Sequence, residues 1–219
     1  MNSKNLSGWF LVLGPLTAFI FSGLLPSFLI ETGTDGGMRA WISDIEDKEA
    51  LTTIFTVISR IGWVSAFIGT VLLCDSMQGA NKPGSVLARI GGIIMIGLAA
   101  LAMVASMDSL ASLNLLNNEL GDSAQNKADA VVAQIVSRTI WTGLFFFWGI
   151  AFVLIGGALV IQKRLNSIVA WIFVVFGTLF VILSVTPIEL AQNVGFLIFG
   201  IMSLNTVIAG VLRLRETED

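Results

Sequence analysis

The stretch Thr53-Ile-Phe-Thr-Val-Ile-Ser-Arg-Ile-Gly-Trp63 decides the fold class of this chain. It lies within an apolar block, residues 51–73, that is long enough to cross the bilayer core of about 30 Å as a helix. Arg60 is its only charged residue and sits about two helical turns inside the block. A charge inside a membrane is costly and needs a partner or a route to water. We therefore ask which other charged residues lie at the same depth.

The composition of the whole chain indicates a membrane protein. Its 219 residues are 55% hydrophobic and 12% charged, whereas a soluble domain carries about twice that share of charge. Apolar residues form six blocks, at 8–30, 51–73, 86–107, 139–161, 167–185 and 188–212. The first block is longer than the roughly 7–15 apolar residues of a signal peptide, so we expect it to be retained. These blocks predict an all-α polytopic protein, a bundle of six transmembrane helices with no second, soluble domain.

Several residue types that a catalytic, cofactor or metal site would need are missing or badly placed. The chain has no histidine, which excludes bis-histidine haem and histidine-ligated iron, zinc or copper. Its five lysines lie outside the apolar blocks or at their ends, which leaves no candidate for a buried retinal-type Schiff base. There is no phosphate-binding glycine loop in a strand–helix context and no basic patch of the size that nucleic acid requires. We expect no enzyme activity, no cofactor, no metal and no nucleic-acid partner.

The distribution of lysine and arginine predicts the orientation. Six spans place both termini on one side of the membrane. The short segments on that side are the basic ones, with Lys4, Lys82, Arg89, Lys163, Arg164, Arg213 and Arg215. The positive-inside rule therefore predicts cytoplasmic termini.

The two long loops lie on the opposite, outer side. Ser43-Asp-Ile-Glu46 matches a capping box, which predicts a helix that begins there and runs straight into the second span. Residues 108–137 form the longest polar region, and we expect the fourth helix to begin within it, near Asn126. The second and fourth helices should thus extend beyond the outer face.

This topology places Arg60 in the outer leaflet, six residues after Ile54 and thus roughly 9 Å deep. Four other ionisable residues at the outer ends of different helices share that depth: Glu31, Asp108, Arg138 and Glu189. We hypothesise a charge cluster in which Glu31 and Glu189, with Asp108 as a further candidate, neutralise Arg60 and Arg138. Snorkelling to the headgroups, a structural ion pair and ligand binding are the alternative interpretations for Arg60.

Two spans carry a stripe of small and polar residues at helical spacing. In the second span the stripe consists of Thr52, Thr56, Ser59, Trp63, Ala66 and Thr70, and we expect it to face the bundle interior. In the sixth span the stripe begins with Glu189, Gln192 and Asn193 and continues to Gly210. The aromatic run from Trp141 to Trp148 is typical of lipid-facing or interhelical packing.

A family resemblance covers about residues 50–172. Its motifs are Ile58-Ser-Arg-Ile-Gly62, the Lys82-Pro83 turn leading to Leu87-Ala-Arg89, and Phe147-Trp-Gly149 followed by Leu154-Ile-Gly156 and Lys163-Arg164. With these motifs the chain resembles a group of small six-helix bacterial membrane proteins known as domain of unknown function 4386. The group usually continues with a proline-containing turn, where this chain has Asn166-Ser-Ile-Val-Ala170. The resemblance implies six helices and a multi-pass location in the inner (plasma) membrane, and it implies no known activity.

Two functional classes remain open. The first is an accessory or scaffold subunit that acts through protein or lipid contacts, with the lipid bilayer and either a homo-oligomer or a larger membrane complex as its partners. The second is a small-solute or ion transporter or channel, in which Arg60, Arg138, Glu31 and Glu189 line an outer-facing cavity. The first predicts a dry interior, and the second predicts a hydrated cavity that reaches Arg60.

Overall fold

The structure is a computed structural model that describes residues 2–30, 37–105, 108–118, 121–186 and 188–216. Of Arg39, Ala105, Asp108 and residues 188–193 it describes the backbone but not the side chains. The regular elements in these residues are all helical: α1 (Ser3–Phe19), the π-helical turn η1 (Ile20–Leu24), α2 (Leu25–Leu29), α3 (Gly37–Asp47), α4 (Glu49–Ser76), α5 (Ser85–Ala105), α6 (Asp108–Leu116), α7 (Ser123–Gln162), α8 (Ser167–Ser184) and α9 (Ile188–Arg215). Six helical stretches are long and apolar enough to cross a membrane. The predicted all-α class with six spans is confirmed.

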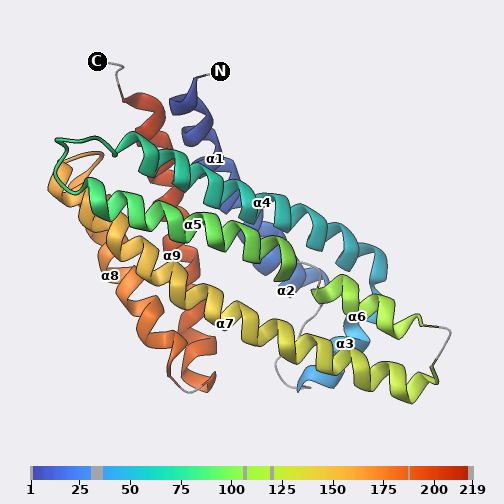
Figure 1. Ribbon diagram of the computed structural model, residues 1–219. Coiled ribbons are helices and arrows are strands. Elements are labelled where there is room, and N and C mark those ends of the chain that lie inside the picture. The colour runs from blue at the N-terminus through green and yellow to red at the C-terminus, as the bar shows by residue number, and fades with distance from the viewer. Residues whose placement is uncertain (1, 31–36, 106–107, 119–120, 187, 217–219) are drawn as a thin grey trace.

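The six spans form a closed ring in chain order. The span made of α1, η1 and α2 packs against α4, α4 against α5, α5 against α7, α7 against α8, and α8 against α9. The ring closes where α9 packs against α1, and the described ends of the chain lie together at one end of the bundle (Figure 1). The placement of both described chain ends at the same end of the bundle is what an even number of spans requires, so that prediction is confirmed. That this end lies on the cytoplasmic side stays a prediction.

Glycines set the closest helix–helix contacts of the ring. Gly14 of α1 and Gly62 of α4 face each other, so that a Cβ at Gly62 would lie 2.5 Å from the amide nitrogen of Ala18. A Cβ at Gly149 of α7 would likewise lie 2.6 Å from the carbonyl oxygen of Gly177 of α8. Only residues without a side chain allow backbones to approach this closely, and such contacts are a main source of helix association in membranes.

Beyond the ring, at the end opposite the termini, α7 continues alongside α3 and α6 (Figure 1). The 40 residues of α7 span roughly 60 Å, about twice the bilayer core, which confirms the predicted extension of the fourth helix. A small apolar core holds this outer part together and contains Ile30, Ile42, Ile45, Phe55, Leu113 and Ala130.

One local prediction for the outer part is wrong. Ser43 does not start the second membrane helix, because Ser43 and Glu46 lie inside the separate helix α3, and α4 begins at Glu49 after a break at Lys48. The break lets α3 turn its apolar residues Ile42 and Ile45 into the outer core. Residues 108–116 form a helix of their own, α6, and α7 begins at Ser123, three residues from the predicted start near Asn126.

Candidate functional site

Arg60 projects from α4 onto an aromatic ring of α7. Its guanidinium carbon lies 5.0 Å from the centroid of the Trp141 ring, within the range of a cation–π contact. Such a contact stabilises by roughly 0.5–1 kcal/mol at exposed sites and by about 2 kcal/mol when desolvated. Trp141 was predicted only as part of an aromatic run, and the two residues are 81 positions apart in the sequence.

The depth of Arg60 agrees with a side chain that reaches toward the outer end of the bundle. Arg60 precedes Ser76, the last residue of α4, by 16 residues, or roughly 24 Å. Side chains tilt toward the N-terminus of their helix, which for α4 is the end away from the termini. Measured from Ser76, the charged head therefore reaches a distance comparable to the thickness of a bilayer core, about 30 Å, which would let Arg60 snorkel toward the interface.

A trough of about 380 Å³ opens beside Arg60. It runs between α4, α5 and α6, and its lining consists of Thr56, Val57, Arg60, Ile61, Val64, Ser65, Met103 and Leu110. The lining is apolar except for the arginine and two hydroxyl residues. Val57, Ile61 and Met103 are 47%, 63% and 54% exposed, so the trough faces outward from the ring, on the side that lipid would cover.

Of the five side chains in the predicted charge cluster, the structure describes two. Arg60 is half-buried against Trp141, whereas Arg138 of α7 is exposed. Glu31 lies outside the described residues, as do the side chains of Asp108, at the first position of α6, and of Glu189, in the first turn of α9. Neutralisation of the two arginines by these acids stays a prediction. The side chains of Gln192 and Asn193 also lie outside the described part.

The centre of the ring is filled by aromatic side chains. Trp63, only 3% exposed, stacks on Phe199 of α9 with ring centroids 5.2 Å apart and meets Trp148 of α7 edge-on at 5.1 Å. Phe67 and Phe152 extend this aromatic centre toward the end with the termini. The small-residue stripe of the second span, Thr52, Thr56, Ser59, Trp63, Ala66 and Thr70, is buried throughout, which confirms that it faces the interior.

A very small void lies inside the aromatic centre. Its volume is about 10 Å³, and Trp63, Phe199 and Ser203 are among the residues that line it. That volume is about the minimum for one water molecule. The indole nitrogen of Trp63 and the hydroxyl of Ser203 have no hydrogen-bond partner among the described residues, which fits a single bridging water rather than an aqueous path.

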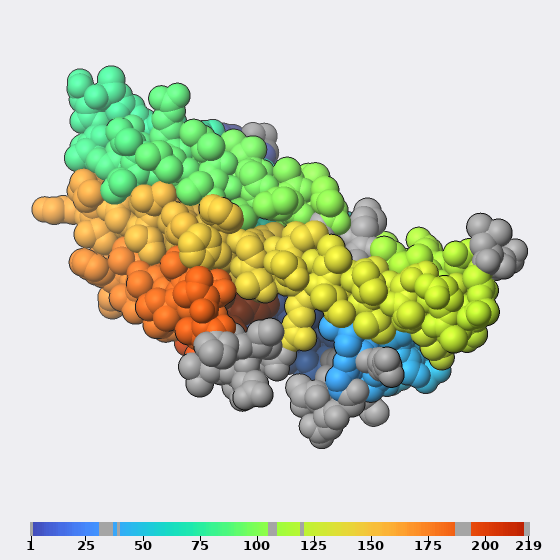
Figure 2. All heavy atoms as spheres, turned by 60° about the horizontal axis from the view of Figure 1, so that its bottom comes forward, coloured from blue at the N-terminus to red at the C-terminus, as the bar shows by residue number. Residues whose placement is uncertain are grey.

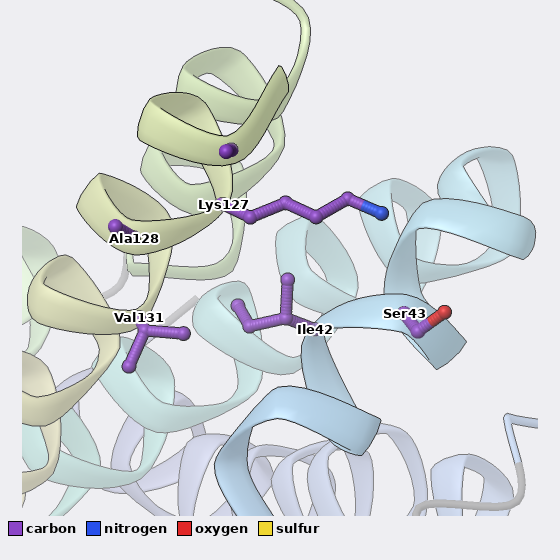
Figure 3. Close-up of a pocket in the computed structure, with 6 residues that line it drawn as sticks. Ile42, Ser43, Lys127, Ala128 and Val131 are labelled. Atoms are coloured by element: carbon purple, nitrogen blue, oxygen red, sulfur yellow. The ribbon is translucent and has the colours of Figure 1, made fainter. Parts of the chain in front are cut away.

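Two further hollows lie on the outside of the bundle. One, of about 310 Å³, lies between α7, α8 and α9, and Figure 2 shows α9 in dark red within the hollow between α7 and α8. The other, of about 400 Å³, separates α3 from α7 in the outer part, where Lys127 reaches across from α7 toward α3 (Figure 3). Lys127 pairs with Glu46 at 3.3 Å, but both side chains are well exposed, and such pairs contribute about 1 kcal/mol or less.

A polar clasp that the sequence did not predict joins four spans at the end with the termini. Arg164, in the turn after α7, donates hydrogen bonds to both carboxylate oxygens of Glu216, at 2.9 and 3.0 Å, and a third bond to Ser76 of α4. Arg213, which is buried, also donates to the Glu216 carboxylate, and Lys4 of α1 donates to the Glu216 carbonyl oxygen. Burial alone would raise the pKa of Glu216, but the bonds from Arg164 and Arg213 outweigh it and lower that pKa.

The described residues contain no group of three or more histidine, cysteine, aspartate or glutamate residues placed to hold a metal ion. Cys74 is a free, buried thiol in α4. In comparisons with known proteins, no family model, no curated protein and no solved structure matches this chain. The resemblance of residues 50–172 to the six-helix group therefore stays a prediction, and the geometry carries the functional argument.

Proposed function

We propose that this protein is a non-catalytic, multi-pass scaffold or accessory subunit of a bacterial inner membrane, which acts through protein or lipid contacts. The observation that carries the proposal is the aromatic centre, in which the void beside Trp63 measures about 10 Å³. A transporter needs a polar cavity that reaches the middle of the bundle. Trp63 and Trp148 occupy that place here.

The surfaces of the described helices also support this proposal. Large apolar side chains are exposed along the outside of the ring, where they can meet lipid or the helices of a partner. The outer part built from α3, α6 and the first half of α7 adds a surface beyond the ring (Figure 1). We expect the acidic residues of this part to contact the partner.

The proposal is tested by the access of water to the aromatic centre. Because Cys74 is the only cysteine, Cys74→Ala provides a background in which single cysteines can be placed. We expect Ser203→Cys, buried beside Trp63, to resist a small hydrophilic methanethiosulfonate reagent until the protein is denatured. Ser43→Cys, exposed on α3, is the matched control and should react at once. Equal reaction rates for the two cysteines would contradict a dry centre and favour the transporter.

A second experiment tests the role as a subunit. Chemical cross-linking in native membranes, followed by purification, should yield a species heavier than the 23.4 kDa chain, either with a second protein or with copies of itself. Recovery of the uncross-linked monomer alone would contradict a scaffold that acts through protein contacts and would leave lipid contacts as its function.

A transporter remains the second candidate because of one observation, the position of Arg60 beside an open trough. For this function, Arg60→Ala in a folded protein should abolish flux of a small anion into proteoliposomes. The scaffold predicts no flux in either the wild-type protein or the variant.

A further inference from the structure

We propose that the outer part of the protein binds a basic amphipathic helix of a partner protein, in the groove between α3 and α7 and along an apolar face of α7 that continues this groove. We call that face the α7 stripe; it consists of Ala124, Ala128, Val131, Val132 and Ile135. The inference rests on the proposed function, since it specifies the partner that the scaffold contacts.

The α7 stripe is an apolar helix face that points away from the outer core. Its members recur at intervals of three and four residues or stand side by side, which places them on one side of the helix. Val132 and Ile135 are 59% and 52% exposed, whereas Asn126 and Ala130 on the other face of α7 are buried. Apolar side chains that are exposed together on a protein surface mark an interaction site.

The bilayer core is too thin to cover the α7 stripe. Ile135 precedes Gln162, the last residue of α7, by 27 residues, or roughly 40 Å along the helix, and Ala124 lies farther out still. The hydrocarbon core of a bilayer is about 30 Å thick. The stripe therefore projects past the hydrocarbon when α7 is measured from Gln162, and a protein partner gains free energy by taking it out of water.

The groove between α3 and α7 extends this surface sideways and has a volume of about 400 Å³ (Figure 3). Ala128 and Val131 of the stripe line it together with Ile42 of α3, so the groove and the stripe form one continuous apolar surface. From Ala124 to Ile135 the stripe is roughly 16 Å long, about three helical turns. A helix that lies along it can place apolar side chains from successive turns into the groove, as in other helix-in-groove complexes.

The charges around this surface select a basic partner. In residues 37–49 and 108–138 the described side chains include six carboxylates but only three cations, Lys48, Lys127 and Arg138. The carboxylates are those of Asp44, Glu46, Asp47, Glu49, Asp122 and Asp129. Glu46 and Asp47 lie one turn beyond Ser43 of the groove on the same face of α3, and Asp129 flanks the stripe on its other side. A helix on the stripe thus has carboxylates along both edges.

The same charges oppose other occupants. Two copies of this surface would bring carboxylates against carboxylates, and an anionic lipid surface would be repelled as well. Basic side chains of this chain such as Lys4 and Arg164 belong to the clasp at the opposite end of the bundle, so they are not placed to reach the groove. A basic segment of another protein is the occupant that the charges favour.

Lys127 is the residue that such a helix has to displace. It reaches across the groove from α7 and pairs with Glu46 at 3.3 Å (Figure 3). Both side chains are well exposed, so the pair contributes little to stability and a cation of the partner can replace Lys127 at the Glu46 carboxylate. Removal of Lys127 should therefore strengthen the binding of a basic helix.

The test uses the full-length protein in phosphatidylcholine nanodiscs and two synthetic helical peptides that carry the same photoreactive group. Both peptides have leucines at positions i, i+3, i+4 and i+7, and the remaining positions are lysines in one peptide and glutamates in the other. The measured quantity is the peptide concentration that gives half-maximal cross-linking to the protein. We expect this concentration to be about tenfold lower for the lysine peptide, because several weak charge pairs at the edges add up.

Three variants locate the binding of the lysine peptide. The double variant Val132→Ser with Ile135→Ser removes two exposed apolar side chains of the stripe and should weaken binding about tenfold. Ile168→Ser, 68% exposed at the end with the termini, is the matched control and should leave binding unchanged. Lys127→Gln should bind the lysine peptide more tightly, a gain that a misfolded protein cannot produce.

Equal half-maximal concentrations for the two peptides would overturn the proposal, and so would unchanged binding in the folded double variant. Unchanged or weaker binding in Lys127→Gln would overturn it as well, as would a loss of binding in Ile168→Ser. Photochemical cross-linking of two copies of the protein along the stripe would assign this surface to a dimer and refute the basic partner. The reactivity of Ser203→Cys is independent of these results. A dry centre without peptide selectivity therefore refutes this inference alone, whereas a reactive Ser203→Cys refutes the proposed function.

Discussion

Gly62→Ala probes the closest helix–helix contact of the ring. The added Cβ would lie 2.5 Å from the amide nitrogen of Ala18, 2.9 Å from the carbonyl oxygen of Gly14 and 3.0 Å from the carbonyl carbon of Thr17. All three atoms belong to the backbone, so no rotamer change can relieve the clash. Since ordinary Cβ contacts begin near 3.4 Å, α1 and α4 have to separate locally by about 0.9 Å.

The change in unfolding free energy caused by Gly62→Ala follows from two opposing effects. Overpacking of this kind destabilises by about 1–3 kcal/mol. Alanine is a better helix former than glycine by about 1 kcal/mol, which offsets part of that loss. Gly97→Ala is the matched control, because Gly97 also lies inside a span and a Cβ there meets nothing within 4 Å. The difference in unfolding free energy between the two variants should therefore be about 1–3 kcal/mol, since the propensity gain is common to both.

The assay is equilibrium unfolding by sodium dodecyl sulfate in mixed micelles, followed by far-ultraviolet circular dichroism. Gly62→Ala should unfold at a lower mole fraction of the denaturing detergent than Gly97→Ala. Gly14→Ala on the facing helix should have a similar effect, and the double variant should lose less than the sum, because the first substitution already separates the helices. Equal midpoints for Gly62→Ala and Gly97→Ala would refute the close packing of α1 on α4.

Three further predictions use the same unfolding assay. Trp63→Ala removes the middle of the aromatic centre and should destabilise the protein by about 3–5 kcal/mol. In that variant a cysteine at position 203 should become reactive toward the hydrophilic reagent. An unreactive cysteine would mean that the centre collapses and stays closed. Asn126→Ala removes the 2.7 Å hydrogen bond to the carbonyl oxygen of Asn118 and should cost about 1–3 kcal/mol, whereas Thr178→Ala, which removes an exposed bond within one helix, should change stability much less. Glu216→Gln should destabilise by about 1–3 kcal/mol, because Arg213 stays buried after losing a charged acceptor. Because the pKa of Glu216 is lowered, its contribution to the stability of the folded protein is complete above about pH 4.5 and is lost as the pH falls through that lowered pKa. The wild-type protein should therefore lose stability in acid more steeply than Glu216→Gln. Parallel profiles of stability against pH for the two proteins would contradict this role.

The candidate site illustrates what could be read from the chain in advance. Arg60 was located from its position in an apolar block, and the burial of the stripe around it follows from helical spacing alone. Its contact with Trp141 was not predicted, because the two residues are 81 positions apart in the sequence. The clasp at Glu216 was missed for the same reason, since Arg164 is 52 positions away. The capping-box prediction at Ser43 failed because the outer core, a tertiary feature, takes Ile42 and Ile45 away from the membrane helix.

The sequence by itself determined that the chain is helical, that six segments can cross a membrane and that an arginine lies inside one of them. Each of these properties depends on residues that are close together in the chain, because hydrophobic length and helical period are local. The tertiary structure alone decided that the spans close into a ring, that aromatic side chains fill its centre and that a trough opens beside Arg60. An apolar helix face can be buried against lipid or against protein, so hydropathy does not select its neighbour; the glycine contacts and the shapes of the side chains do.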